Sequence, residues 1–260
     1  DNDGTTVAFS HNPSFGIEIW QFTQELTLTA DLTDQLDLIV GGLYLREKAK
    51  EPLVFVSLPL GITEYSADPE QNLTSYSVYT QLRYQFTDAL RISAGVRYTN
   101  DKKTYLDEQI FNGFPLGEIP GDDSWDAITP RVAVDYDLDE NITLFGNVSR
   151  GFKAGGFSTW AIPADDFEPE YVWNYELGIK AGMLDDRLRL AAAGFYSDYT
   201  DLQQNVFGED GSVTPTIQNA ASAKIMGLEF ELEALVAENF RFNVAGTWLD
   251  TEFKELKSDD

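Results

Sequence analysis

Apolar and polar residues alternate along most of this chain. The clearest example is MGLEFELEAL at residues 226–235, where Glu229, Glu231 and Glu233 occupy every second position. A helix would spread these glutamates around its surface, whereas a strand places them in one row on one face. The pattern therefore predicts strands with one apolar and one polar face.

The alternation predicts ten such strands. Their ranges are 20–30, 36–47, 76–86, 90–99, 128–138, 142–152, 171–183, 188–199, 226–235 and 240–248. Most have roughly ten to thirteen residues, enough to span about 25–30 Å when tilted by ~40°. Strands of soluble sheets are usually nearer five or six residues.

The connections between these strands also alternate in length. After each odd-numbered strand comes a tight, polar turn, and after each even-numbered strand comes a long connection. The long connections are 48–74, 100–126, 153–169 and 200–219. In an up-and-down sheet, all short joins then lie at one end and all long joins at the other, as in outer-membrane barrels. We expect an all-β, antiparallel, up-and-down transmembrane β-barrel with its apolar face toward lipid and its polar face toward the lumen.

Aromatic residues near the strand ends fit the two interfacial girdles of such a barrel. They are Trp20, Tyr44, Tyr98, Tyr171, Trp173, Tyr196, Tyr199 and Trp248. The alternative is a soluble β-sandwich, β-helix or propeller, in which the apolar faces would meet a protein core.

Composition narrows the function classes. The chain has 260 residues, 18 Lys+Arg against 44 Asp+Glu, a net charge of −26 and no cysteine. This acidity argues against nucleic acid as a partner. Without cysteine, and with His11 as the one histidine, no thiolate or transition-metal cluster is expected. No apolar run approaches the ~18 residues of a membrane helix.

Four segments carry a family resemblance. They are SRGFKAGGF at 149–157, YVWNYELGIK at 171–180, NAASAKIMGLEFE at 219–231, and the hairpin from FTDAL at 86–90 to GVRYT at 95–99. Together they resemble the barrel strands of TonB-dependent outer-membrane receptors, and the similarity extends from about Gln24 to the end of the chain.

The resemblance implies a barrel of about 22 strands closed by an N-terminal plug. It also implies TonB-driven import across the outer membrane of a Gram-negative bacterium, with outer-membrane lipid and the TonB complex as partners. The implied cargo is a ferric siderophore or similar iron complex. We expect residues 1–260 to be one part of the barrel domain, with the plug and the closing strands outside it. Cobalamin or oligosaccharide uptake, a passive porin-like channel and a soluble binding module stay open as alternatives.

Two sets of residues are candidates for binding. In and beside the 153–169 connection, aromatic and basic side chains suit contact with cargo: Arg150, Lys153, Phe157, Trp160 and Phe167. A girdle or loop-packing role is equally open for them. On the lumen face, we expect Glu229, Glu231, Glu233 and Arg241 to face the plug, or to balance charge across strands together with Arg187 and Arg189.

No catalytic or cofactor site is expected. The sequence has no Ser/His/Asp set, and Gly151, Gly155 and Gly156 are not followed by the GK[ST] of a phosphate loop. The acidic pairs Asp122–Asp123 and Asp165–Asp166 lie in expected loops, where they would bind Ca²⁺ or remain solvated. Residues 100–126 carry seven carboxylates against two lysines, which would repel a bare anionic ligand.

Overall fold

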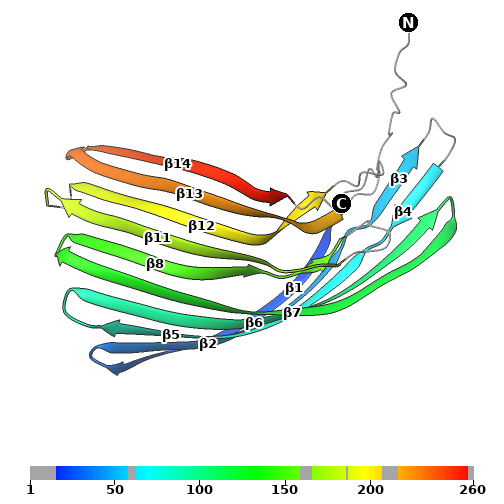
Figure 1. Cartoon of the computed structure of the whole chain (residues 1–260), viewed down its shortest axis with the longest axis horizontal. Coiled ribbons are helices and arrows are strands. Elements are labelled where there is room, and N and C mark those ends of the chain that lie inside the picture. Colours follow the sequence, from blue (N-terminus) through cyan, green and yellow to red (C-terminus); the bar gives the residue numbers. More distant parts are fainter. Residues whose placement is uncertain (1–15, 58–62, 159–165, 186, 207–215, 257–260) are drawn as a thin grey trace, which may run out of the picture.

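The computed structural model describes residues 16–57, 63–158, 166–185, 187–206 and 216–256, which form strands joined by turns. The strands are β1 (Glu18–Thr33), β2 (Leu36–Lys50), β3 (Leu53–Ser57), β4 (Thr63–Ala67), β5 (Glu70–Gln85), β6 (Leu90–Phe111), β7 (Phe114–Asp139), β8 (Ile142–Lys153), β9 (Gly156–Phe157), β10 (Asp166–Phe167), β11 (Glu170–Met183), β12 (Leu188–Val206), β13 (Thr216–Ala237) and β14 (Phe240–Leu256) (Figure 1). Within the described ranges, no helix is long and apolar enough to cross a membrane, a finding without bearing on crossing by strands.

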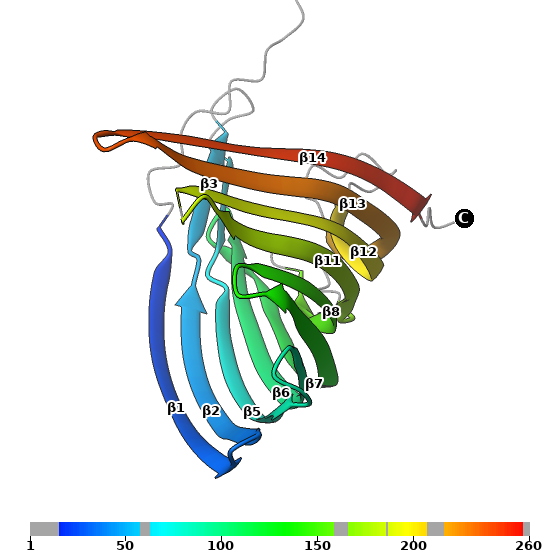
Figure 2. The same cartoon turned by 90° about the vertical axis from the view of Figure 1, so that its left-hand side faces the viewer.

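Ten long strands form one antiparallel sheet in the order β1-β2-β5-β6-β7-β8-β11-β12-β13-β14. The ten predicted strands and their up-and-down order are thereby confirmed. The sheet curves into an open trough, with β1 and β14 at its two edges (Figure 2). The described residues therefore form one wall of a barrel that they do not close.

The expected long connection at 100–126 is wrong. β6 and β7 continue as one hairpin to a two-residue turn at Asn112 and Gly113, whose φ angles are 51° and 79°. Asn-Gly is the favoured pair for this left-handed turn. The extension was missed because both of its faces carry polar residues, so the alternation that marks a lipid-facing strand stops near Asn100.

The expected connection 200–219 is too long, because β12 continues to Val206 and β13 begins at Thr216. Two further connections contain strands that were not predicted. β3 and β4 form a hairpin within 48–74, and β4 pairs with the extended part of β6. β9 and β10 pair with each other within 153–169. The end of the sheet opposite the tight turns therefore contains paired strands and does not consist of loops alone.

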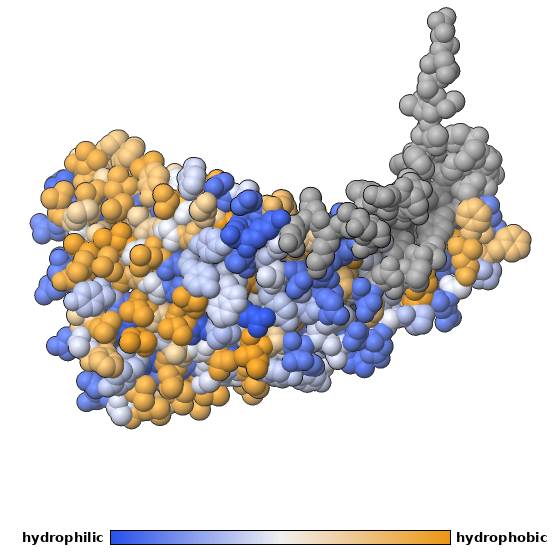
Figure 3. All heavy atoms as spheres, viewed as in Figure 1, coloured by the Kyte–Doolittle hydropathy of each residue, from blue (hydrophilic) through white to orange (hydrophobic). Residues whose placement is uncertain are grey.

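The convex face of the trough is apolar and uncovered. Leu26, Leu177 and Leu228 lie on it with exposed fractions of 72%, 72% and 60%. Hydrophobic residues gather toward the end of the sheet with the tight turns, and hydrophilic residues predominate toward the other end (Figure 3). An extended surface of exposed leucines is typical of a face that contacts lipid and not water.

Charged residues mark where this apolar band stops. In the ten long strands, every outward-facing lysine or arginine lies toward the end opposite the tight turns. These residues are Arg46, Lys48, Lys50, Lys102, Arg150, Lys224 and Lys254. Asp126 and Asp250 also face outward, each one step closer to the tight turns than the nearest of these cations, and the outward positions from there to the turns carry no charge. Outer-membrane barrels have short turns on the periplasmic side, so the tight turns are periplasmic and the opposite end of the sheet is extracellular.

Candidate functional site

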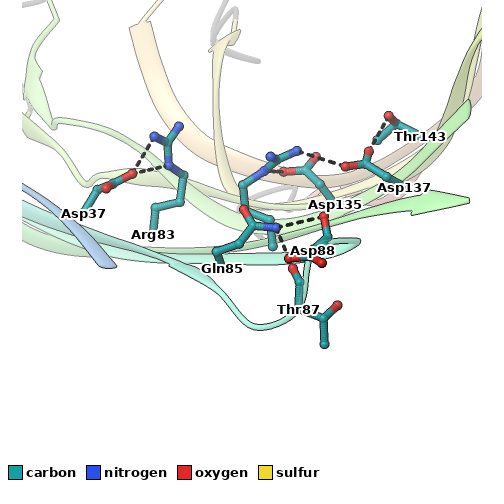
Figure 4. Close-up of polar contacts among 9 residues, drawn as sticks. Asp37, Arg83, Gln85, Thr87, Asp88, Asp135, Asp137 and Thr143 are labelled. Carbon is teal, nitrogen blue, oxygen red and sulfur yellow. Dashed lines mark hydrogen bonds and ion pairs between the residues drawn. The ribbon is translucent and has the colours of Figure 1, made fainter. Parts of the chain in front are cut away.

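The concave face of the trough carries ion pairs between neighbouring strands. The Arg83 guanidinium donates two hydrogen bonds, of 2.8 and 2.5 Å, to one carboxylate oxygen of Asp37. Arg91 lies 3.5 Å from Asp135 and 3.9 Å from Asp137. Figure 4 shows these groups side by side on the inner surface. The inner wall thus offers a water-facing, mixed-charge surface, as expected for a lumen.

Closer to the extracellular end, an aromatic side chain lies flat against the inner wall. The Tyr79 hydroxyl donates to Glu25 at 2.9 Å, and the Arg97 guanidinium lies 5.6 Å from the Tyr79 ring centroid. Arg97 also donates to the Ser77 hydroxyl at 2.6 Å. A Cβ at Gly41 would overlap the Tyr79 ring, so the glycine makes this position possible.

The segment that follows β8 folds inward onto the β6–β7 hairpin. Its residues 154–158 and 166–169 are called the mouth segment below. Phe157, 7% exposed, lies 5.8 Å from the Tyr105 ring centroid and 6.0 Å from that of Trp125. Gly121 makes room for it, since a Cβ there would lie 2.6 Å from the Phe157 ring. These aromatic rings form the buried hydrophobic cluster of the described residues.

A half-buried lysine holds the same segment from β6. The Lys103 ammonium donates to the Gly155 carbonyl at 2.6 Å and lies 5.8 Å from the Trp125 ring centroid. Burial lowers the pKa of Lys103, because the charged form loses solvation there. A Cβ at Gly155 would meet the Trp125 ring at 2.5 Å and would overlap the Phe167 carbonyl oxygen. Gly155, which lies between β8 and β9, can approach Trp125 and Phe167 this closely only because it has no side chain.

The mouth segment is also fixed from β12 and β13. The Asn219 amide accepts a 2.7 Å hydrogen bond from the Glu168 N–H and donates to the carbonyls of Glu168 and Asp201, each at 2.7 Å. The Ile217 N–H donates to the buried Ser158 hydroxyl at 2.8 Å. Gln203 of β12 adds a 3.0 Å hydrogen bond to the Ala154 carbonyl. The segment is therefore attached on both sides.

The predicted cargo contacts lie in different surroundings. Lys153 points inward with its side chain 64% exposed, 3.9 Å from Glu170. Phe157 is buried and Phe167 is half-buried. Arg150 lies on the outward face, with its guanidinium 4.1 Å from the Tyr171 ring centroid. Trp160 lies outside the described residues. Cargo contact stays a prediction for all five, and Lys153 is the best exposed of those described.

The predicted plug-facing residues share the inner face near the periplasmic end. Arg241 lies 3.2 Å from Glu233, so one expected cross-strand pair is present. Glu229 and Glu231 are exposed on the same face. Arg187 donates instead to the backbone carbonyls of Leu235 and Val236. Contact with a plug stays a prediction for these residues.

Asp122 and Asp123 cannot act together on one cation. They lie on β7, where successive side chains point to opposite faces. Asp122 lies 2.9 Å from Lys102, and Asp123 accepts from the Ser124 N–H at 2.6 Å. Across the described ranges, no three acidic or histidine residues could hold a metal ion. Asp165 and His11 lie outside those ranges.

The residues that fix the mouth segment were missed in the sequence. Tyr105 and Trp125 lie about fifty and thirty residues before Phe157, inside what was expected to be a loop. Asn219 belongs to one of the recognised motifs, yet nothing in a single sequence shows that its amide reaches Glu168. A signal did exist for the hairpin, because Asn112–Gly113 is a typical turn pair.

The family model described as TonB dependent receptor-like, beta-barrel matches residues 1–260. The chain belongs to this family. Its members are receptors of the Gram-negative outer membrane and not enzymes, which agrees with the expected location and lack of catalysis. The fold expected from the resemblance is confirmed as well.

Two relatives show how similar the chain is to characterised receptors. It is 28% identical to the pesticin receptor of Yersinia pestis over 223 residues, which cover 83% of this chain and 31% of the relative. It is also 28% identical to the metal-pseudopaline receptor CntO of Pseudomonas aeruginosa over 182 residues, covering 70% of this chain and 25% of the relative. The chain thus spans about a third or less of the curated relatives it matches.

Solved structures agree on the fold. The ferric yersiniabactin uptake receptor FyuA of Yersinia pestis matches 92% of this chain and 36% of its own, with a TM-score of 0.80 and 24% identity. The ferric-catecholate import receptor Fiu of E. coli matches 93% and 39%, with a TM-score of 0.67 and 19% identity. At these identities the likeness shows the barrel fold alone.

Proposed function

We propose that the protein to which this chain contributes is a TonB-dependent importer of ferric siderophores or similar iron complexes. The observation that carries the proposal is sequence similarity to receptors whose names state a metal or iron complex. One is the metal-pseudopaline receptor described above, and another is the ferric-pyoverdine M114 receptor PbuA of a Pseudomonas strain, which is 23% identical over 192 residues. These similarities extend over 70–83% of the chain and are not confined to one motif.

The inner surface favours a receptor with a narrowed entrance and argues against a wide passive pore. The mouth segment lies on the inner side of the sheet and is fixed to β6, β12 and β13 by side-chain hydrogen bonds. Fixed groups at an entrance present a preorganised binding surface, which costs less entropy on binding than a mobile loop. In this proposal Lys153 and the mouth segment meet the cargo, while Glu229 and Glu231 meet the plug.

The proposal is tested with the full-length protein in a host strain that lacks its own iron-complex receptors. Uptake of ⁵⁵Fe from a panel of ferric siderophores would be measured with TonB present and with TonB deleted. We expect TonB-dependent uptake of at least one complex. Uptake that persists without TonB would indicate a passive channel, and no uptake of any iron complex would refute the assigned cargo.

A second cargo class is favoured by one observation. The metal-pseudopaline receptor matches this chain as closely in identity as the pesticin receptor does, and its name states a metal chelate without naming iron. Chelates of other transition metals are therefore the second candidate. Parallel uptake assays with ⁶⁵Zn and ⁶³Ni chelates separate the two, because an iron receptor would leave these counts at background.

A further inference from the structure

Four cations cluster on the outward face of the β2–β5–β6 region. We call Arg46, Lys48, Lys50 and Lys102 the outward basic patch. Thr74 pairs with both Arg46 on one side and Lys102 on the other, so these two cations lie at the same level with Thr74 between them. Since neighbouring strands are about 4.8 Å apart, their Cα atoms are separated by about 10 Å. Two long side chains can close that distance around a single anionic group.

The patch overlaps the extracellular edge of the aromatic girdle, where Phe22 pairs directly with Arg46. Tyr44 and Tyr76 pair directly, with ring centroids 5.2 Å apart, and Phe22 lies 6.3 Å from Tyr44. Arg46 and Thr74, each two residues farther along, are the next outward pair. Aromatic girdles lie at the headgroup level of a bilayer. The outward basic patch therefore lies among the headgroups or just above them, on the face turned away from the lumen.

Internal ion pairs leave part of this charge available. Glu70 binds Lys48 at 2.6 Å and Lys50 at 3.0 Å, which lowers the pKa of Glu70 to about 2 and raises that of Lys50. Lys102 pairs with Asp122 at 2.9 Å, yet its side chain is 53% exposed. Such exposed pairs exchange readily for another anion.

Arg46 has the most freedom in the patch. Its side chain is exposed, and among the described residues it makes no ion pair or hydrogen bond. Such an arrangement is unexpected in a chain of net charge −26, where carboxylates are plentiful. A planar guanidinium with five N–H donors is well suited to bind phosphate oxygens, and the Thr74 hydroxyl beside it adds a further donor.

We propose that the outward basic patch binds the phosphate groups of a phosphorylated lipid in the outer leaflet of the outer membrane. Cargo and plug cannot reach this face, because it is opposite the lumen. Anionic lipid headgroups attract cations at a membrane surface, and each lysine or arginine there strengthens binding about fivefold. The inference depends on the outer-membrane location and not on the identity of the cargo.

The test uses the full-length receptor purified in an uncharged detergent. Diphosphoryl lipid A and the same lipid after enzymatic removal of its phosphates would be titrated, and bound lipid counted by native mass spectrometry. The double variant Arg46→Gln/Lys102→Gln should bind the phosphorylated lipid roughly thirtyfold more weakly. The charge-conserving variant Arg46→Lys/Lys102→Arg should stay within a few-fold of the unmodified receptor.

Arg131→Gln is the matched control, because Arg131 is an exposed cation on the inner face. It should leave lipid binding unchanged. Equal binding by the double variant, equal binding of the lipid without phosphates, or the same loss in the Arg131 variant would overturn the proposal. Folding of each variant is checked by its heat-dependent mobility on gels. Failure of iron uptake with intact lipid discrimination would refute the proposed cargo alone.

Discussion

The Lys103 ammonium donates a 2.6 Å hydrogen bond to the carbonyl oxygen of Gly155, a residue 52 positions farther along the chain. This hydrogen bond connects the extended β6–β7 hairpin to the mouth segment. This hydrogen bond has a cost, because burial disfavours the charged form of the lysine and so lowers its pKa. A charge-assisted hydrogen bond to the carbonyl and the nearby Trp125 ring offset that cost. The geometry therefore assigns Lys103 a positioning role.

Replacing Lys103 by methionine should loosen the mouth segment. The change keeps the length of the side chain but leaves the Gly155 carbonyl without its donor, at an expected cost of about 1–3 kcal/mol. Hydrogen exchange of the amides at 155–158 should accelerate by about tenfold or more in the full-length receptor. Lys102→Met is the control, because Lys102 points outward from the neighbouring position. Equal exchange in the two variants would contradict the positioning role.

Gly155→Ala should be more damaging than its size suggests. The added Cβ would meet the Trp125 ring at 2.5 Å and overlap the Phe167 carbonyl oxygen, and backbone cannot move as a flexible side chain can. We expect faster trypsin cleavage after Lys153 in the folded receptor. Gly42→Ala offers a comparison, since the nearest atom to a Cβ there is 3.5 Å away. Resistance of the Gly155 variant equal to that of the Gly42 variant would show that the segment tolerates displacement.

Asn219→Asp should weaken the attachment to β13. The aspartate retains an acceptor for the Glu168 N–H but loses both donors, and it places a negative charge against two carbonyl oxygens. We expect a lower melting temperature and faster hydrogen exchange at 166–169. Gln218→Glu tests the same chemical change one residue earlier, where the amide bonds only Thr216. A matching shift in both variants would indicate a charge effect without a specific role for Asn219.

The sequence predicts the barrel wall because lipid on one face and water on the other impose alternation. That constraint ends at the membrane boundary, so the extension of β6 and β7 past Asn100 reads as polar sequence even though it is a strand. The mouth segment was recognised through its glycine-rich motif, and Phe157 was singled out within it. Its partners Tyr105 and Trp125 could not be, because their contact depends on how far the hairpin rises beside β8.

The ion pairs of Glu70 should persist far into acid. Its carboxylate is held by Lys48 and Lys50, and its pKa falls from an ordinary value of 4.5 to about 2. A carboxyl group with a lowered folded-state pKa adds stability that is present above about pH 4.5 and lost as the pH falls toward 2. Because these pairs lie near the surface, the expected contribution is at most about 1 kcal/mol.

Glu70→Gln should remove this contribution and also raise the positive charge of the outward basic patch. Thermal unfolding in detergent should show a small destabilisation at pH 5–7 that shrinks below pH 4. Diphosphoryl lipid A should bind this variant more tightly than the unmodified receptor, since one competing carboxylate is gone. Glu252→Gln is a comparison on the outward face of β14, away from the patch, and should leave lipid binding unchanged. Weaker lipid binding by the Glu70 variant would mean that Glu70 orients the lysines for the phosphate and does not merely compete with it.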